Sequence, residues 1–174
     1  WWSNAGANHI IGKDILITHA VYWPTMLMAM NAPLPITIFA HGWILNQDNE
    51  KMSKSKGSVM DPVSMVRMTD VDPLRYFLIH DVPLGKDAPV SHELIASRIN
   101  NDLANNLGNL LSRSSNLIVK YFDGKAPAST GTDEDTQDIQ ELCEAVPAKV
   151  QKHISHFEPT EALEAILEVL NATN

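Results

Sequence analysis

A strand–helix–strand pattern near the start of this sequence limits what the chain can fold into more than any other feature. His9-Ile10-Ile11 has the apolar, β-branched character of a buried strand that ends at Gly12, and residues 36–40 predict a second strand. The residues from Ile15 to Met30 are apolar at helical spacing, with Pro24 as a predicted kink. Two short strands joined by such a helix form a βαβ unit, so we expect a parallel sheet.

The rest of the chain has a helical pattern. Asp61-Pro62 and Asp72-Pro73 each place a capping carboxylate before a proline at the first helical position. Ser91 is a predicted cap for a long helix that Asp123-Gly124 ends. This helix carries an apolar stripe, made of Ile95, Ile99, Leu103, Leu107, Leu110, Leu111, Leu117 and Ile118.

Two further amphipathic helices follow a loop over residues 125–132. Thr132 and Asp135 resemble a capping box for the first, Pro147 predicts a bend in it, and the second begins near Pro159. Three such helices joined by short loops predict an antiparallel bundle. We therefore expect an α/β fold followed by an all-α one, with three domains over residues 1–57, 58–90 and 91–174.

Charge and cysteine content exclude several classes of protein. The net charge of −8 argues against a general nucleic-acid binder, and residues 91–174 alone carry six Lys and Arg against thirteen Asp and Glu. Any RNA contact there must be local. The single cysteine, Cys143, excludes internal disulfides and a Cys-cluster zinc site, and we expect it to be small and buried. No apolar run approaches the roughly 18 residues of a membrane span.

The most informative motif is Lys51-Met52-Ser53-Lys54-Ser55, in a polar loop after the second predicted strand. Two ammonium groups three residues apart, with two hydroxyls, suit a clamp on a polyphosphate. When a carboxylate attacks the α-phosphate of ATP, such a loop lowers the barrier by binding the departing pyrophosphate more tightly. The competing interpretation is that these lysines are simply solvated.

These five residues match letter for letter the second signature of class I aminoacyl-tRNA synthetases. Other blocks resemble methionyl-tRNA synthetases in order and spacing, and the resemblance is dense over residues 9–118. The blocks are Ile11-Gly12-Lys13-Asp14-Ile15, His19-Ala20-Val21-Tyr22-Trp23-Pro24, Phe39-Ala40-His41-Gly42-Trp43, Asp72-Pro73-Leu74-Arg75-Tyr76-Phe77-Leu78 and Asn105-Asn106-Leu107-Gly108-Asn109-Leu110-Leu111-Ser112-Arg113.

The resemblance implies a methionine–tRNA ligase, which makes methionyl-adenylate from methionine and ATP and then charges tRNA(Met). Residues 1–57 resemble the second half of its Rossmann-like catalytic domain, 58–90 its stem-contact subdomain and 91–174 a truncated anticodon-binding bundle. The implied partners are methionine, ATP with Mg²⁺, tRNA(Met) and the missing N-terminal half, with no metal site in this segment and no membrane. A bacterial cytoplasmic origin is favoured over a mitochondrial one.

The resemblance also implies roles for individual residues. Lys51 and Lys54 would be catalytic, and His19 and Trp23 would enclose methionine, with Thr18 standing where the family often has an aromatic residue. Asn109 and Arg113 would contact the anticodon. The residues that would bind ATP are Gly12, Asp14, Ile44, Lys51, Ser53, Lys54 and Ser55.

Plainer interpretations stay open for several of these positions. His19 and Trp23 share one helix face and suit a core as well as a pocket, and Asp14 suits a helix N-cap. His41 and Trp43 are packing residues or ligands. A solvated polar face explains Asn109 and Arg113 equally well.

Two other functions compete with the first. One is a free-standing synthetase-derived module that binds tRNA without catalysis, although a pure binder has no need of the Lys51–Ser55 loop. The other is a related class I synthetase for a branched aliphatic amino acid or cysteine.

We expect the isolated 174 residues not to activate methionine. The first signature of the family, a His-Ile-Gly-His-like turn that holds ATP, does not occur in them, and neither does its inserted domain with a metal knuckle. Methionine-dependent exchange of pyrophosphate into ATP measures this activity, and exchange above background would contradict the expectation.

Overall fold

The computed structural model describes residues 6–52, 60–128 and 134–174, and the chain forms two compact units. The first consists of Trp1–Val59 and Val82–Val90, and the second of Met60–Asp81 and Ser91–Asn174. Residues 82–90 therefore leave the second unit between two of its helices and pack with the first. The predicted division into three domains at residues 57 and 90 stays a prediction.

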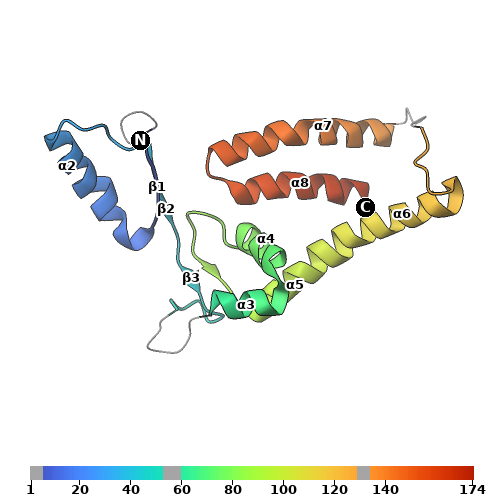
Figure 1. Ribbon diagram of the computed structural model, residues 1–174, viewed down its shortest axis with the longest axis horizontal. Coiled ribbons are helices and arrows are strands. Elements are labelled where there is room, and N and C mark those ends of the chain that lie inside the picture. Colours follow the sequence, from blue (N-terminus) through green and yellow to red (C-terminus); the bar gives the residue numbers. More distant parts are fainter. Residues whose placement is uncertain (1–5, 53–59, 129–133) are drawn as a thin grey trace. The chain divides into compact units, whose positions relative to one another are not determined.

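The first unit contains the βαβ arrangement that the sequence predicts. β1 (Asn8–Gly12) pairs in parallel with β2 (Thr37–His41), in a register that places the last residue of each strand opposite the other. The helical chain between them lies beside the strands (Figure 1). The two faces of β1 differ, because Ile11 is buried whereas Ile10 is 55% exposed. The expectation of a wholly buried strand is therefore wrong at Ile10.

The connection between the strands is helical but not one regular α-helix. It consists of a 3₁₀ turn, η1 (Lys13–Ile15), a π-helical stretch, η2 (Thr18–Tyr22), and an α-helix, α2 (Trp23–Ala29). Pro24 lies in the first turn of α2, directly after the π-helical stretch. Proline lacks an N–H and crowds the carbonyl of the preceding turn, and a wider π turn gives its ring room.

A second parallel pair joins residues that are far apart in the sequence. β3 (Ile44–Leu45) pairs with β4 (Ala88–Pro89), which belongs to the segment of residues 82–90. The backbone of this segment approaches Gly42 so closely that a Cβ there would overlap the carbonyl oxygen of Lys86. Position 42 therefore needs glycine if the segment is to pack against β3.

The second unit is helical. Its helices are α3 (Pro62–Thr69), α4 (Val71–Asp81), α5 (His92–Arg98), the π-helical η4 (Ile99–Gly108), α6 (Asn109–Phe122), α7 (Glu134–Ser155) and α8 (Pro159–Thr173). Helices α7 and α8 run antiparallel, side by side, and α8 also packs against α4 (Figure 1). Within the described part of the chain, none of the helices combines the length and apolarity that a membrane crossing requires.

Four of the predicted helix ends are confirmed, including the start of α8 at Pro159, and one is wrong. Asp61 accepts hydrogen bonds from the N–H groups at the start of α3, and the Ser91 hydroxyl accepts one at the start of α5. Asp123 ends α6 in the left-handed conformation, with a φ of 52°. Asp72 is not a cap, because α4 begins one residue earlier and places it in the first helical turn. Thr132 lies outside the described residues.

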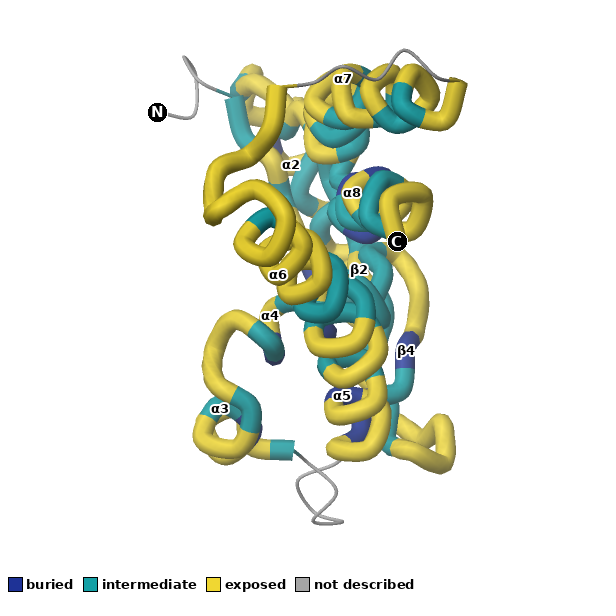
Figure 2. The backbone as a smooth tube through the Cα atoms, turned by 90° about the vertical axis from the view of Figure 1, so that its right-hand side faces the viewer, coloured by how far each residue is buried: buried dark blue, intermediate teal, exposed yellow. Residues whose placement is uncertain are grey.

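The core of the second unit lies where α4, α5 and α8 meet. Phe77 is 0% exposed and Ile95 1%, and Figure 2 colours the buried positions dark blue. The hydroxyl of Thr160, at the start of α8, donates to the carbonyl oxygen of Ile79 over 2.7 Å and ties α8 to α4. On α8 the buried side chains are small, those of Thr160, Ala162 and Ala165, which lets its neighbours approach closely.

The predicted apolar stripe of the long helix is buried only near its beginning. Ile95 is in the core, whereas Leu111 in α6 is 66% exposed. Cys143, expected to be buried, is exposed on α7. Periodicity identified these helices correctly, but it could not show how much of each face its neighbours cover.

A polar network next to this core joins α4 to the long helix. Arg98 donates from two guanidinium nitrogens to the two oxygens of Asp81, each over 2.8 Å, and reaches Asp102 over 3.2 Å. Tyr76 donates to Asp102 over 2.6 Å. Burial, and then this carboxylate, raise the pKa of Tyr76, so its hydroxyl keeps the proton that the network needs.

We expect Phe77→Ala to lower the free energy of unfolding by about 3–5 kcal/mol, the usual cost of emptying a buried aromatic site. Urea denaturation followed by far-ultraviolet circular dichroism measures this loss on the helical signal. Met68→Ala is the matched control, because Met68 in α3 is 64% exposed. Equal losses in the two variants would contradict the placement of Phe77 in the core.

Candidate active site

The carboxyl ends of two parallel strands meet at one edge of the first unit. Gly12, which ends β1, lies opposite His41, which ends β2. The chain turns after each strand, and Asp14 and Trp43 lie two residues beyond those ends. Ligands of open α/β sheets bind at this edge, because loops from neighbouring strands converge there. Several of the predicted ATP-binding residues therefore lie at this edge of the sheet.

Asp14 receives two donors from other loops. The indole N–H of Trp43 donates to its carboxylate over 3.0 Å, and the ammonium of Lys51 lies 3.2 Å from the same oxygen. These donors, Trp43 first, hold the pKa of Asp14 below its usual range. The side chain stays 52% exposed, so the charged carboxylate is open to a ligand. Its partners are not the first N–H groups of a helix, so the N-cap interpretation is wrong.

Two lysine ammonium groups lie over the side chain of Trp43. The ammonium of Lys13 is 3.9 Å from the centroid of a Trp43 ring and that of Lys51 is 4.3 Å away. An ammonium at this distance is attracted by the negative face of the indole. Trp43 is thus part of the site and not simply a packing residue, because its indole contacts the charged groups of Asp14, Lys13 and Lys51.

A second carboxylate, Asp87, completes this cluster from the segment of residues 82–90. Both of its oxygens lie 2.6 Å from the ammonium of Lys13, and one accepts the backbone N–H of Trp43 over 2.9 Å. Lys13 and then the Trp43 N–H hold the pKa of Asp87 low. Asp87 is not among the residues predicted from the sequence, because it lies 74 residues from Lys13 and outside any recognised motif.

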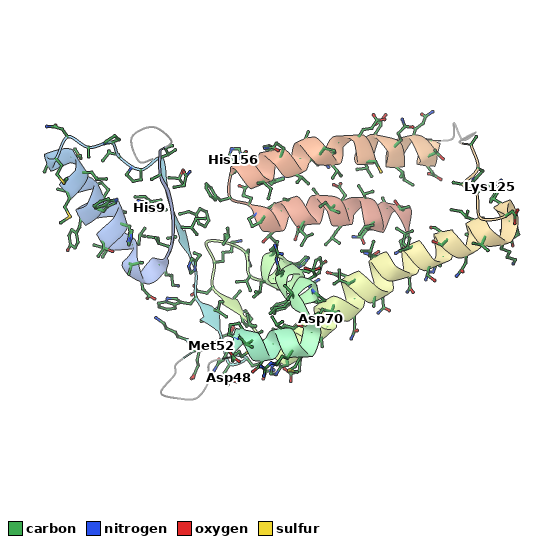
Figure 3. All side chains as sticks on the ribbon, in the orientation of Figure 1. His9, Asp48, Met52, Asp70, Lys125 and His156 are labelled. Carbon is green, nitrogen blue, oxygen red and sulfur yellow. The ribbon has the colours of Figure 1, made fainter. Side chains whose placement is uncertain are left out.

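Lys51 is brought to Asp14 by a tight turn. The side-chain oxygen of Asn46 accepts the backbone N–H groups of Asp48 and Glu50 over 3.0 and 2.8 Å, and Lys51 then forms an antiparallel bridge with Leu45. Asp48 and Met52 are labelled in Figure 3. The next three residues of the motif, Ser53, Lys54 and Ser55, lie outside the described residues.

Two other predicted ATP ligands lie at the same edge. Ile44 opens β3, directly after Trp43, and its side chain is 45% exposed. A Cβ on Gly12 would make only ordinary contact with the His41 ring, at 3.7 Å. Nothing within the described chain therefore requires glycine at position 12, and a close approach of a ligand to that backbone stays a prediction.

The predicted methionine-binding residues line one pocket of about 350 Å³. His19 and Trp23 lie on its helical wall, and the ring of His9 on β1 meets that of His19 edge-on, with centroids 5.9 Å apart (Figure 3). His19 Nδ1 lies 2.9 Å from the carbonyl oxygen of Ile15, which orients the ring. The other lining residues are Thr18, Tyr22 and Met26.

Three of these pocket residues, His9, Tyr22 and Met26, were not predicted as ligands from the sequence. A usable signal existed, because Tyr22 and Met26 are four apart and follow His19 on the helix. His9 had no such signal, since its side of the strand depends on where the helix packs.

The predicted anticodon residues lie in the second unit. Arg113 is exposed on α6 and donates to the side-chain oxygen of Asn174 over 3.3 Å. Asn109 is half-buried at the start of the same helix. Asn106 bonds both Asn171 and Asn174 over 2.7 Å. Arg113 is thus part of a polar cluster at the end of α8, and its contact with RNA stays a prediction.

The described residues offer no evident metal site. Among residues 6–52, 60–128 and 134–174, no group of three or more His, Cys, Asp and Glu side chains comes together as a metal ion would need.

Comparison with known proteins gives a consistent result. The family model described as "tRNA synthetases class I (M)" matches residues 1–115. The chain is 42% identical over 166 residues to the methionine–tRNA ligase of Clostridium acetobutylicum, covering 95% of this chain and 26% of that protein. It is 42% identical over 167 residues to that of Bacillus subtilis, covering 95% and 25%. The chain thus spans about a quarter of the length of the curated relatives it matches.

A solved structure is similar over almost the whole chain. It is that of Mycobacterium tuberculosis methionyl-tRNA synthetase bound by methionyl-adenylate, with a TM-score of 0.88 and 41% identity. The similarity covers 97% of this chain and 33% of that one.

We expect Trp43→Phe to raise the pKa of Asp14 toward the ordinary value of about 3.9. The substitution removes the indole N–H, the strongest of the groups that stabilise the carboxylate, and keeps an aromatic face for the lysines. Carbon-13 NMR of the Asp carboxyl groups across an acid titration measures the change. Asp61, which bonds Ser64 at the start of α3, is the internal control. An unchanged Asp14 titration would contradict the assigned hydrogen bond.

Proposed function

The chain belongs to the class I methionyl-tRNA synthetases, and from this premise we propose that it acts as part of an enzyme that activates methionine with ATP and transfers it to tRNA(Met). The observation that carries the proposal is the meeting of Asp14 and Lys51, 3.2 Å apart, at the carboxyl edge of β1 and β2. A carboxylate suited to ribose hydroxyls and a lysine suited to phosphates are adjacent there.

In this proposal the nucleotide lies across the strand ends. Asp14 accepts hydrogen bonds from the ribose hydroxyls, the backbone at Gly12 approaches the nucleotide, and the backbone at Ile44 follows the adenine. Lys51, with Ser53, Lys54 and Ser55, engages the phosphates. Mg²⁺ enters with ATP as part of the substrate, and this segment supplies no metal site of its own.

The chemical step is an attack by the methionine carboxylate on the α-phosphorus. The bond between the α-phosphorus and the oxygen that bridges to the β-phosphate breaks. Pyrophosphate leaves with the electron pair of that bond, so negative charge grows on it. Lys51 and Lys54 stabilise that growing charge more than they stabilise bound ATP, which lowers the barrier. The position of Lys51 beside Asp14 supports this role, because a nucleotide held by Asp14 would have its phosphates within reach of the lysine loop.

The pocket between β1 and the helix suits the side chain of methionine. A thioether is apolar and polarisable, and it packs well against aromatic rings. Trp23 and Tyr22 supply such rings, and His19, held by the carbonyl oxygen of Ile15, supplies a polar edge for the sulfur. Thr18 takes up one side of the pocket, where the family often has an aromatic residue.

We further propose that β1 and β2 belong to a larger Rossmann-like sheet, completed by an N-terminal half of the same synthetase. Residues 58–90 act as a connecting, stem-contact subdomain and residues 91–174 as an antiparallel helical bundle that reads the anticodon through Asn109 and Arg113. Because this region carries six Lys and Arg against thirteen Asp and Glu, such a contact must be local rather than a broad electrostatic one. A bacterial cytoplasmic setting fits the relatives above.

The competing functions are less well supported. A free-standing tRNA-binding module would not need the cluster around Asp14 and Lys51. The relatives named above are methionine–tRNA ligases, which gives no support to a synthetase for a branched aliphatic amino acid or cysteine.

In the full-length synthetase we expect Trp23→Ala to raise the KM for methionine about tenfold or more, the range for a lost contact in an apolar pocket. The KM for ATP should change little, because neither Asp14 nor Lys51 lines the pocket. Pyrophosphate exchange at varied methionine and varied ATP measures both constants.

Met30→Ala is the matched control for Trp23→Ala, since Met30 follows α2 and is 73% exposed. If Trp23→Ala raised the KM for methionine and the KM for ATP equally, or left the KM for methionine unchanged, the pocket would be rejected as the methionine site.

A further inference from the structure

Residues 82–90 bring one acidic side chain to the candidate active site. The segment lies between α4 and α5 in the sequence, yet it packs with the first unit through β4 and the close contact at Gly42. Its carboxylate, Asp87, has no role in the chemistry described above. It is nevertheless bound to Lys13, which precedes Asp14 in the sequence, and to Trp43, which donates to Asp14.

Asp87 and Asp14 each pair with one lysine of the cluster. Lys13 pairs with Asp87 at 2.6 Å and Lys51 pairs with Asp14 at 3.2 Å, with the Trp43 indole facing both ammonium groups. Two cations thus lie over the Trp43 ring, the indole N–H donates to Asp14, and the backbone N–H of the same residue donates to Asp87. Each cation has its own carboxylate, so neither carboxylate is bridged by both lysines.

This pairing matters because Lys13 has a second possible partner. Lys13 directly precedes Asp14 in the chain, and its charge already acts on the Asp14 carboxylate. Without a negative charge at position 87, the ammonium of Lys13 would be left beside the indole with Asp14 as the remaining anion of the cluster. Asp14 would then be held by two lysines and less available to hydroxyl donors.

We propose that Asp87 is a positioning residue for the nucleotide, which holds Lys13 away from Asp14 and so keeps that carboxylate available to the ribose. The inference rests on the proposed function, because it assumes that Asp14 accepts from ribose hydroxyls. Asp87 itself touches no substrate and acts through Lys13 and Trp43.

The test uses the full-length synthetase with Asp87→Asn. An asparagine oxygen still accepts the Trp43 backbone N–H, so the change removes the charge that holds Lys13 and little else. We expect the KM for ATP to rise about tenfold, as for other residues that orient a ligand-binding group. The KM for methionine should stay within about twofold, and the preference for ATP over 2′-deoxy-ATP should fall, because Asp14 is partly occupied.

A second substitution separates positioning from a general loss of structure. Adding Lys13→Gln to Asp87→Asn removes the competing cation, and we expect the KM for ATP to return to within about threefold of the wild type. Asp87→Glu keeps the charge and should retain the wild-type preference for ATP. A simple packing defect would not be repaired by a second substitution.

Asp48→Asn is the matched control, because Asp48 is an exposed carboxylate on the turn before Lys51. Asp87→Asn kinetics equal to those of this control, or a defect that Lys13→Gln does not relieve, would overturn the inference alone. If Asp14→Asn leaves the KM for ATP unchanged, or the wild type shows no methionine-dependent exchange, the proposed function fails as well.

Discussion

The parallel pairing of β1 with β2 is the constraint on which the candidate active site depends. Its register sets Gly12 opposite His41, and so the chain that follows each strand leaves from the same edge. Asp14 and Trp43 can then form a hydrogen bond although they are 29 residues apart. A slip of one residue in this register would shift the end of one strand along the other and separate the carboxylate from the indole.

The second constraint is a close backbone contact. The absence of a side chain at Gly42 lets the backbone around Lys86 lie against β3, and β4 then pairs with it. This contact carries Asp87 to Lys13 and to the Trp43 N–H. The first unit therefore receives the Asp87 carboxylate from residues 82–90, whereas the helices on either side of this segment, α4 and α5, belong to the second unit. The packing of the chain into units therefore does not follow the order of its segments in the sequence.

Local features of the fold were predictable from the sequence, because their causes are local. A carboxylate at Asp61 or a hydroxyl at Ser91 bonds N–H groups two or three residues away, and Asp123-Gly124 tolerates the left-handed backbone that ends a helix. Errors arose where burial depends on distant neighbours. Ile10, Leu111 and Cys143 have the composition of core residues, but their exposure is decided by which helices pack against them.

The candidate site divides in the same way. The sequence by itself determined the strand–helix–strand unit, the lysine-rich motif that begins at Lys51 and the pair of His19 with Trp23 on one helix face, since each is a pattern of neighbours. Only the tertiary structure decided that Lys51 meets Asp14, that His9 lines the pocket and that Asp87 joins the cluster. Such contacts cross 37 and 74 residues of chain, and strand register and backbone packing, rather than any local pattern, bring them within hydrogen-bonding distance.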